Sequence, residues 1–182
     1  MMKRNNFPFS AVLGLNHAKT AILIVLVNPR AGGLLISGPR GIGKSTLMRS
    51  TQELIERPWR DIPVSVTEDR LFGTIDTEKA IYSGQKKLYP GIINEADQGV
   101  LYLDDANLLR EDLLDSILNI AEVGAYQLER DGLSLRCDTS FTIIAAINPE
   151  SGMLSGACLD QFGLFVNVDN IHDENTRVEI LK

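Results

Sequence analysis

Apolar and polar residues alternate along this chain in blocks that predict an α/β fold. Short apolar runs predict buried strands over Leu34–Ser37, Val100–Leu103 and Phe141–Ile147, because strands covered on both faces of a sheet are apolar throughout. A further strand is expected over Ile62–Val66. Since strands that alternate with helices are typical of parallel sheets, we expect a three-layer α/β/α arrangement around a mainly parallel sheet.

Helices are predicted between these runs by the spacing of their apolar residues. The stretch Glu111–Glu122 has apolar residues at 113, 114, 117, 118 and 121, the i, i+3, i+4 pattern of a helix with one buried face. Helices are also expected over four further stretches: His17–Val27, Gly43–Glu56, Thr77–Tyr82 and Gly91–Ala96.

Two segments depart from this strand–helix alternation. Residues Gly124–Asp138 alternate apolar and polar side chains around Arg130-Asp131-Gly132, which predicts a β-hairpin. The last segment, Asp173–Lys182, begins a helical pattern without an end signal. We therefore expect one domain over residues 1–182, cut off before the element that would follow.

Composition restricts the functional classes. The net charge of −6 and the pI near 4.9 argue against a non-specific nucleic-acid binder, which normally carries a basic surface. The longest apolar run, Ala21–Val27, is far shorter than the roughly 20 residues of a membrane-spanning helix. The N-terminus lacks the apolar core of a secretion signal, so a cytoplasmic protein with no membrane partner is expected. Cys137 and Cys158 have no metal-ligand spacing and are expected to be reduced thiols.

A glycine-rich segment between a predicted strand and a predicted helix gives the clearest functional signal. The residues GPRGIGKS at 38–45 match G-x-x-x-x-G-K-[ST], the P-loop pattern, in which backbone N–H groups surround a phosphate. Lys44 is expected to reach the β- and γ-phosphates of ATP, and the Ser45 hydroxyl to bind Mg²⁺. The expected nucleotide-binding residues are Gly38, Pro39, Arg40, Gly41, Ile42, Gly43, Lys44, Ser45 and Thr46.

Polar residues at the ends of two later strands supply the rest of an expected ATP-hydrolysing site. Asp104 and Asp105 follow the strand Val100–Leu103, which we expect to lie beside the strand before the P-loop. Asp104 is then a metal-binding candidate, and Asp105 a candidate for polarising the attacking water. Asn148 ends the strand Phe141–Ile147 and is expected to position that water as a γ-phosphate sensor. The alternative for Asn148 is a turn-forming residue before Pro149.

Together these motifs resemble the ATP-hydrolysing I subunit of magnesium chelatase, a family of the AAA+ superfamily of P-loop NTPases. The resemblance runs from Phe7 nearly to Lys182 and is carried by several segments in order: FPFSAVLG, NPRAGGLLISGPRGIGKST, TEDRLFGTIDTEKAI, PGIINEADQGVLYLDDANLL, GAYQLERDGLSLR, NPESG and LDQFGL. It places Glu68-Asp69-Arg70 in a loop characteristic of the chelatase branch, and it gives Lys44, Ser45, Asp104 and Asn148 the roles already expected of them.

The resemblance also implies what the whole protein does. Family members form hexameric rings that use ATP to help a larger partner assembly insert a metal ion into a tetrapyrrole. It implies a homo-oligomeric ring and a larger chelatase-type or von Willebrand-type partner subunit for this chain. A MoxR-type chaperone ATPase acting on a protein client is the related alternative.

Two positions depart from the family pattern and leave a second interpretation open. The family's Asp-Glu pair is here Asp104-Asp105, and the arginine of its L-D-R-F-G segment is here Gln161. A shorter carboxylate and a neutral amide would both weaken hydrolysis, because they stand where water is polarised and phosphate charge is stabilised. The chain also ends before the family's helical lid domain. A weakly hydrolysing, nucleotide-dependent assembly module is therefore the alternative to an efficient ATPase.

Overall fold

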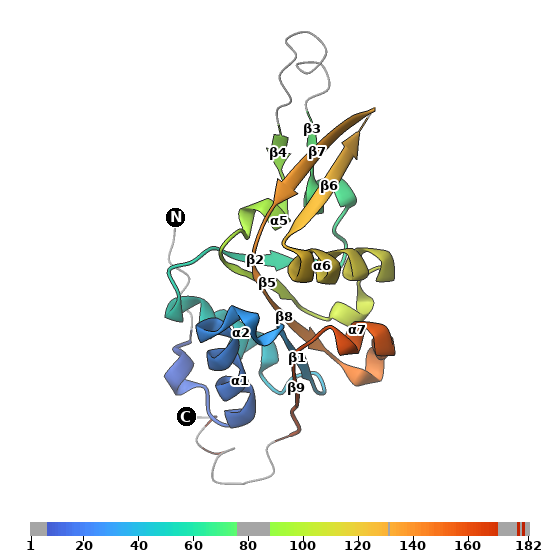
Figure 1. Cartoon of the computed structure of the whole chain (residues 1–182). Helices are drawn as coiled ribbons and strands as arrows, with labels where there is room; N and C mark the ends of the chain where they lie inside the picture. The colour runs from blue at the N-terminus through green and yellow to red at the C-terminus, as the bar shows by residue number, and fades with distance from the viewer. Residues whose placement is uncertain (1–6, 76–87, 131, 171–177, 179, 181–182) are drawn as a thin grey trace.

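The central element of the fold is a five-stranded parallel sheet (Figure 1). The computed structural model describes residues 7–75, 88–130, 132–170, 178 and 180. The strand order is β2-β5-β8-β1-β9. The strands are β1 (Leu34–Ser37), β2 (Trp59–Ile62), β5 (Val100–Leu103), β8 (Thr142–Ile147) and β9 (Leu164–Asn167).

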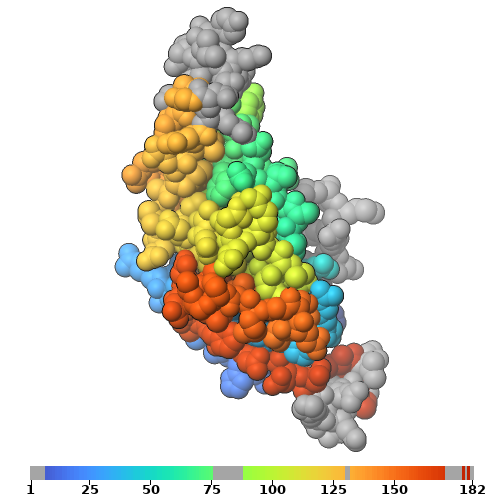
Figure 2. Space-filling model, turned by 90° about the vertical axis from the view of Figure 1, so that its right-hand side faces the viewer, coloured from blue at the N-terminus to red at the C-terminus, as the bar shows by residue number. Residues whose placement is uncertain are grey.

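Helices cover both faces of this sheet, which confirms the predicted three-layer arrangement. On one face, side chains such as Val100 and Tyr102 pack with those of α1 (Asn16–Val27) and α2 (Lys44–Thr51). On the other face, Leu101 and Leu103 pack with the longer helix α6 and three short helices. Those elements are α3 (Glu68–Phe72), α5 (Ile92–Glu95), α6 (Glu111–Val123) and α7 (Gly156–Asp160). Figure 2 shows α6, in yellow, beside the orange segment that contains α7.

Two antiparallel ribbons project from the same end of the molecule in Figure 1. One pairs β3 (Gly73–Ile75) with β4 (Leu88–Pro90), and the other pairs β6 (Ala125–Arg130) with β7 (Leu133–Asp138). The second ribbon confirms the predicted hairpin. Short 3₁₀ turns complete the elements: η1 (Phe9–Ala11), η2 (Pro29–Ala31), η3 (Gln52–Leu54), η4 (Ala106–Leu108) and η5 (Pro149–Ser151).

The strand predicted over Ile62–Val66 was wrong. The strand β2 ends at Ile62, because Pro63 follows it and a proline has no N–H group to donate to a neighbouring strand. Val66 is nevertheless buried, so its apolar character reflects core packing and not strand pairing. The helix predicted over Gly43–Glu56 is also shorter, since α2 ends at Thr51 and continues as the turn η3.

The predicted neighbour of β1 was wrong as well. We expected the strand that ends at Asp104 to lie beside β1, but β8 lies between them. All six residues of β8 are buried, as expected of a central strand of a sheet that is covered on both faces. The edge strand β9, the ribbon β3–β4 and the helix α7 were not predicted at all.

Two predicted helices fall largely on residues that the structure does not describe. The whole of Thr77–Tyr82 lies outside the described residues. Within Asp173–Lys182 only Val178 and Ile180 are described, and both are helical. In the parts of the chain that are described, no helix has both the length and the apolar character needed to cross a membrane.

The packing of β5 against α6 gives a first testable prediction. Leu101 is fully buried, whereas Leu23 on α1 is 45% exposed. Leu101→Ala should lower the free energy of unfolding by about 2–5 kcal/mol, because it removes buried methyl groups and leaves a cavity. The same substitution at Leu23 should change it by less than about 1 kcal/mol. Denaturant unfolding of both variants measures the difference, and equal losses would contradict the core assigned here.

Candidate nucleotide-binding site

The predicted site residues meet where three neighbouring parallel strands end. Gly38 follows β1, Asn148 follows β8 and Asp104 follows β5, and these strands are adjacent in the sheet. The Gly38 N–H donates to the Ile147 carbonyl at 3.2 Å, which ties the start of the P-loop to the end of β8. Ligands of open α/β sheets bind at this edge, outside the carboxyl ends of the strands.

The P-loop owes its shape to two glycines with positive φ. Gly41 has φ +82° and Gly43 has φ +92°, values that residues with a Cβ atom rarely adopt. A Cβ atom at Gly41 would meet no other atom within 4 Å, so the backbone conformation and not crowding requires glycine there. Helix α2 begins directly after Gly43, at Lys44. The loop therefore brings the positive end of a helix dipole to the place where an anion would bind.

Lys44 lies inside this loop. Its ammonium group donates to the carbonyl oxygens of Gly38, at 2.6 Å, and Pro39, at 2.8 Å, and the residue is 7% exposed. Burial lowers the pKa of Lys44 below its usual value, against the opposing effect of Asp105 and Asp104, which favour the charged form. A phosphate oxygen could accept the same protons, so the amine is placed to exchange backbone carbonyls for a nucleotide.

Ser45 and Asp104 form the contact that joins α2 to β5. The Ser45 hydroxyl donates to Oδ2 of Asp104 at 2.8 Å. Both groups are partly buried, and both offer oxygen atoms, the ligands that Mg²⁺ prefers. The structure thus brings together the two residues predicted to hold the metal, and their donor atoms fit it.

Asp105 lies beside the P-loop and forms an ion pair with it. Its carboxylate Oδ2 is 3.7 Å from the Arg40 guanidinium, and its backbone has a positive φ of 51°, which Asp tolerates better than most residues. The pair is solvent-exposed, with Arg40 66% and Asp105 33% exposed at their side chains, so it is a weak contact. The predicted water-polarising carboxylate therefore lies at the expected edge of the sheet, but it is paired with Arg40 of the P-loop.

Asn148 is at the same edge, 2% exposed, and its side chain is engaged in the turn that follows it. Its Oδ1 accepts from the Glu150 N–H at 3.2 Å, and its Nδ2 donates to Ser151 Oγ at 3.1 Å. These bonds are those of the turn-forming alternative. A sensor role would require at least the bond to Ser151 to give way.

Asn107 is a structural link that sequence reasoning missed. Its Nδ2 donates to the carbonyls of Asn148, at 3.2 Å, and Gly152, at 3.0 Å. It thereby connects the turn after β5 with the turn after β8. No sequence pattern indicated this contact, because the residues are more than 40 positions apart and their strands are neighbours only in the folded sheet.

Two other predicted positions lie elsewhere. Gln161 is exposed at the end of α7, where its amide donates to the Ala157 carbonyl at 3.4 Å. The three residues 68–70 were expected in a loop, which was wrong: they open helix α3, whose N-cap Thr67 accepts from the Arg70 N–H. A threonine at the N-cap stabilises the start of a helix. The negative charges of Glu68 and Asp69 in the first turn interact favourably with the positive end of the helix dipole.

Tyr102 is a second residue that sequence reasoning missed. It lies two positions before Asp104 on β5, so both side chains point to the face covered by α2. The residue is 5% exposed, and its hydroxyl has no hydrogen-bond partner among the described residues. Burial raises the pKa of Tyr102 well above its usual value, and the charge of Asp104 raises it further. The two-residue spacing between Tyr102 and Asp104 was the signal in the sequence that their side chains share one face of the strand.

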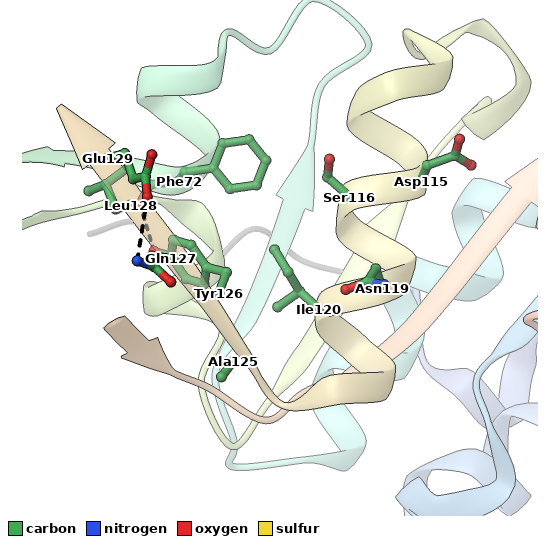
Figure 3. A pocket seen from close by; sticks show the side chains of 10 residues that line it. All are labelled: Phe72, Asp115, Ser116, Asn119, Ile120, Ala125, Tyr126, Gln127, Leu128 and Glu129. Atoms are coloured by element: carbon green, nitrogen blue, oxygen red, sulfur yellow. Dashed lines mark hydrogen bonds between the residues drawn. The ribbon is translucent and has the colours of Figure 1, made fainter. Parts of the chain in front are cut away.

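A groove of about 720 Å³ lies away from these residues (Figure 3). Helix α6 and strand β6 form most of its wall, with Phe72 at one end. No residue of the P-loop and none of the strand-end acids lines it. The groove is therefore separate from the edge where the predicted site residues meet.

Comparisons with known proteins agree with this geometry. Residues 33–161 match the family described as "AAA domain (dynein-related subfamily)". The chain is 36% identical over 96% of its length to the magnesium-chelatase 38 kDa subunit of Cereibacter sphaeroides, and 33% identical over its full length to a magnesium-chelatase subunit ChlI homolog of Methanocaldococcus jannaschii. It spans 62% and 60% of those relatives.

A solved structure is similar over nearly the whole fold. It belongs to a cryo-electron-microscopy study of the complex between subunits BchI and BchD of magnesium chelatase. The TM-score is 0.83 at 36% identity, covering 98% of this chain and 66% of the other. Sequence and fold comparisons thus point to the same group of proteins.

The position of Lys44 inside the P-loop predicts how strongly the affinity for ATP depends on its amine. Lys44→Ala should weaken binding of a fluorescent ATP analogue at least about tenfold, because a charge-assisted hydrogen bond to phosphate is lost. Arg136→Ala, on the exposed ribbon β6–β7, removes the same charge and should leave binding unchanged. Equilibrium titration measures both variants. Equal affinities for wild type and Lys44→Ala would contradict the assignment of the P-loop as the binding site.

Proposed function

This chain belongs to the dynein-related subfamily of AAA domains, and we propose that it binds ATP together with Mg²⁺ and hydrolyses the bond between the β- and γ-phosphates. The observation that carries the proposal is the hydrogen bond between Ser45 and Asp104, 2.8 Å long, beside a lysine held inside the P-loop. This contact supports the proposal because it brings two side-chain oxygen donors of the kind that Mg²⁺ prefers beside the P-loop, at the edge where three strands end.

The chain's own residues divide the work of binding between them. The loop N–H groups and the N-terminus of α2 surround the phosphates, and Lys44 donates to their oxygens. Ser45 and Asp104 would hold Mg²⁺, which when bound neutralises charge on the β- and γ-phosphates. Ser45 lies in the first turn of α2 and Asp104 at the end of β5, so both are positioned by elements with a buried core.

Hydrolysis requires a residue that orients the attacking water, and Asp105 is the candidate. In the structure this carboxylate forms an ion pair with the Arg40 guanidinium at 3.7 Å. In the catalytic role it would break that pair and accept a hydrogen bond from water. Arg40 would then be free to face the phosphates from the loop. Asn148 would help to position the water if its bond to Ser151 opens.

The relatives support a role for this ATPase in a larger assembly. The similar proteins are named as subunits of magnesium chelatase, and the similar structure is a complex of two such subunits. We therefore propose that the chain acts in a ring with copies of itself and with a larger chelatase-type partner, and that ATP turnover drives metal insertion into a tetrapyrrole. If the chain instead acts on a protein client, as a MoxR-type chaperone ATPase, a von Willebrand-type subunit would take the place of the chelatase-type partner.

A second candidate function rests on two specific observations. Asp105 is paired with Arg40, and the exposed Gln161 offers no positive charge to a neighbouring subunit. Both features favour a domain that holds nucleotide firmly and turns it over slowly. Such a domain would regulate assembly through the bound nucleotide.

The proposed metal site predicts the effect of one carboxylate. Asp104→Asn should lower Mg²⁺-dependent ATP hydrolysis by the full-length protein at least about a hundredfold, because an amide is a poorer ligand than a carboxylate. Asp138→Asn, at an exposed end of β7, is the matched control and should hydrolyse at the wild-type rate. Phosphate release measures both. Wild-type turnover by Asp104→Asn would overturn the proposed metal site.

Gln161 distinguishes the efficient ATPase from the slow regulator. If turnover is slow because a positive charge is missing, Gln161→Arg should raise it at least about tenfold under conditions where the chain is oligomeric, since arginine fingers contribute about 10³–10⁵ where measured. Gln127→Arg, at an exposed position of strand β6, makes the same change elsewhere and should have no effect. Robust wild-type hydrolysis that neither variant alters would exclude the slow-regulator function.

A further inference from the structure

Tyr102 has a buried hydroxyl without a partner, beside the proposed metal site. A tyrosine 5% exposed normally finds a hydrogen-bond partner for its hydroxyl, because an unpaired buried polar group costs free energy. Phenylalanine would fill the same core position without that cost. The hydroxyl at this position therefore calls for a function that an apolar ring could not perform.

The neighbours of the ring show where this hydroxyl acts. Tyr102 and Asp104 are two residues apart on β5, and their side chains share the face that α2 covers. Burial has the largest effect on the pKa of the phenol and raises it, and the nearby Asp104 carboxylate raises it further. Trp59 on the adjacent strand β2 packs against the ring, with 6.0 Å between the ring centroids. The strand spacing and this packing therefore place the phenol on the same face of the sheet as the carboxylate of the proposed metal site.

Asp104 has room for one more donor. Ser45 donates to its Oδ2, so a carboxylate with two oxygens and about four lone-pair positions is only partly satisfied by this contact. The Tyr102 hydroxyl can donate one proton, and the carboxylate can only accept. The two groups are chemically complementary.

We propose that Tyr102 is a positioning residue of the metal site: its hydroxyl donates to the Asp104 carboxylate when a magnesium nucleotide binds, and so orients that carboxylate toward the metal. This inference rests on the proposed function and adds a residue to it. Tyr102 touches neither the nucleotide nor the reacting atoms. It acts through Asp104 alone, and the hydroxyl finds its partner in the loaded state.

The test is Tyr102→Phe in the full chain, which removes one oxygen atom and keeps the ring. The concentration of Mg²⁺ that half-maximally tightens binding of a non-hydrolysable ATP analogue should rise about tenfold, because the metal ligand loses a charge-assisted hydrogen bond. Affinity for the analogue without Mg²⁺ should stay within about twofold of wild type. Calorimetric titration at graded Mg²⁺ concentrations measures both quantities, with thermal unfolding recorded in parallel to show that the variant is folded.

Tyr126→Phe is the matched control. Tyr126 is also partly buried, but its hydroxyl donates within the distant groove region, being 2.7 Å from the Phe72 carbonyl and 2.7 Å from Asn94 Oδ1. This variant should lose stability and keep the wild-type dependence on Mg²⁺. If both tyrosine variants shift the Mg²⁺ midpoint equally, the effect is structural and the inference is overturned.

The double variant Tyr102→Phe/Asp104→Asn separates this inference from the function on which it rests. If Tyr102 acts through Asp104, the double variant should need no more Mg²⁺ than Asp104→Asn alone. Additive shifts would overturn the inference. An unchanged midpoint in Tyr102→Phe, with a raised midpoint in Asp104→Asn, would overturn it as well and leave the proposed metal site intact. An unchanged midpoint in Asp104→Asn would overturn the metal site itself.

Discussion

The hydrogen bond between Ser45 and Asp104 is the contact on which the rest of the site depends. It joins the first turn of α2 to the end of β5, although β8 lies between β5 and β1, the strand that leads into the P-loop and α2. The position of Ser45 follows from the loop conformation that Gly43 permits, and the position of Asp104 follows from a strand whose four residues are all buried. The core on both faces of the sheet therefore holds the two proposed metal ligands together.

The residues proposed to bind nucleotide and those proposed to support hydrolysis are held in place by different kinds of contact. The groups proposed to bind are held by direct hydrogen bonds: Lys44 donates to two carbonyls of the loop, and Ser45 donates to a carboxylate. The groups that would support hydrolysis are held by weaker or alternative contacts. Asp105 faces an exposed cation, and Asn148 bonds within its own turn. A domain built in this way can bind before its catalytic groups are arranged, so a neighbouring subunit or partner could control the second step.

The sequence predicted the local features of this site better than the non-local ones. The P-loop was predictable because eight contiguous residues determine its shape, and β1 and β5 because each is a continuous apolar run. The order of the strands was not, since the place of β8 depends on pairings between segments about 40 or more residues apart. The edge strand β9 escaped prediction because only one of its faces is partly buried, and a four-residue stretch carries little periodicity. The role of the Tyr102 hydroxyl could not be read from an apolar run, because it depends on neighbours from α2 and β2.

A crystal structure of the full-length protein with Mg²⁺ and a non-hydrolysable ATP analogue tests the central claim most directly. The account predicts that the Lys44 amine leaves the carbonyls of Gly38 and Pro39 for the phosphates. It also predicts a metal ion about 2.1 Å from Ser45 Oγ, with Asp104 in its ligand shell either directly or through one water. A nucleotide bound away from the P-loop, or a metal ion with neither Ser45 nor Asp104 in its shell, would contradict it.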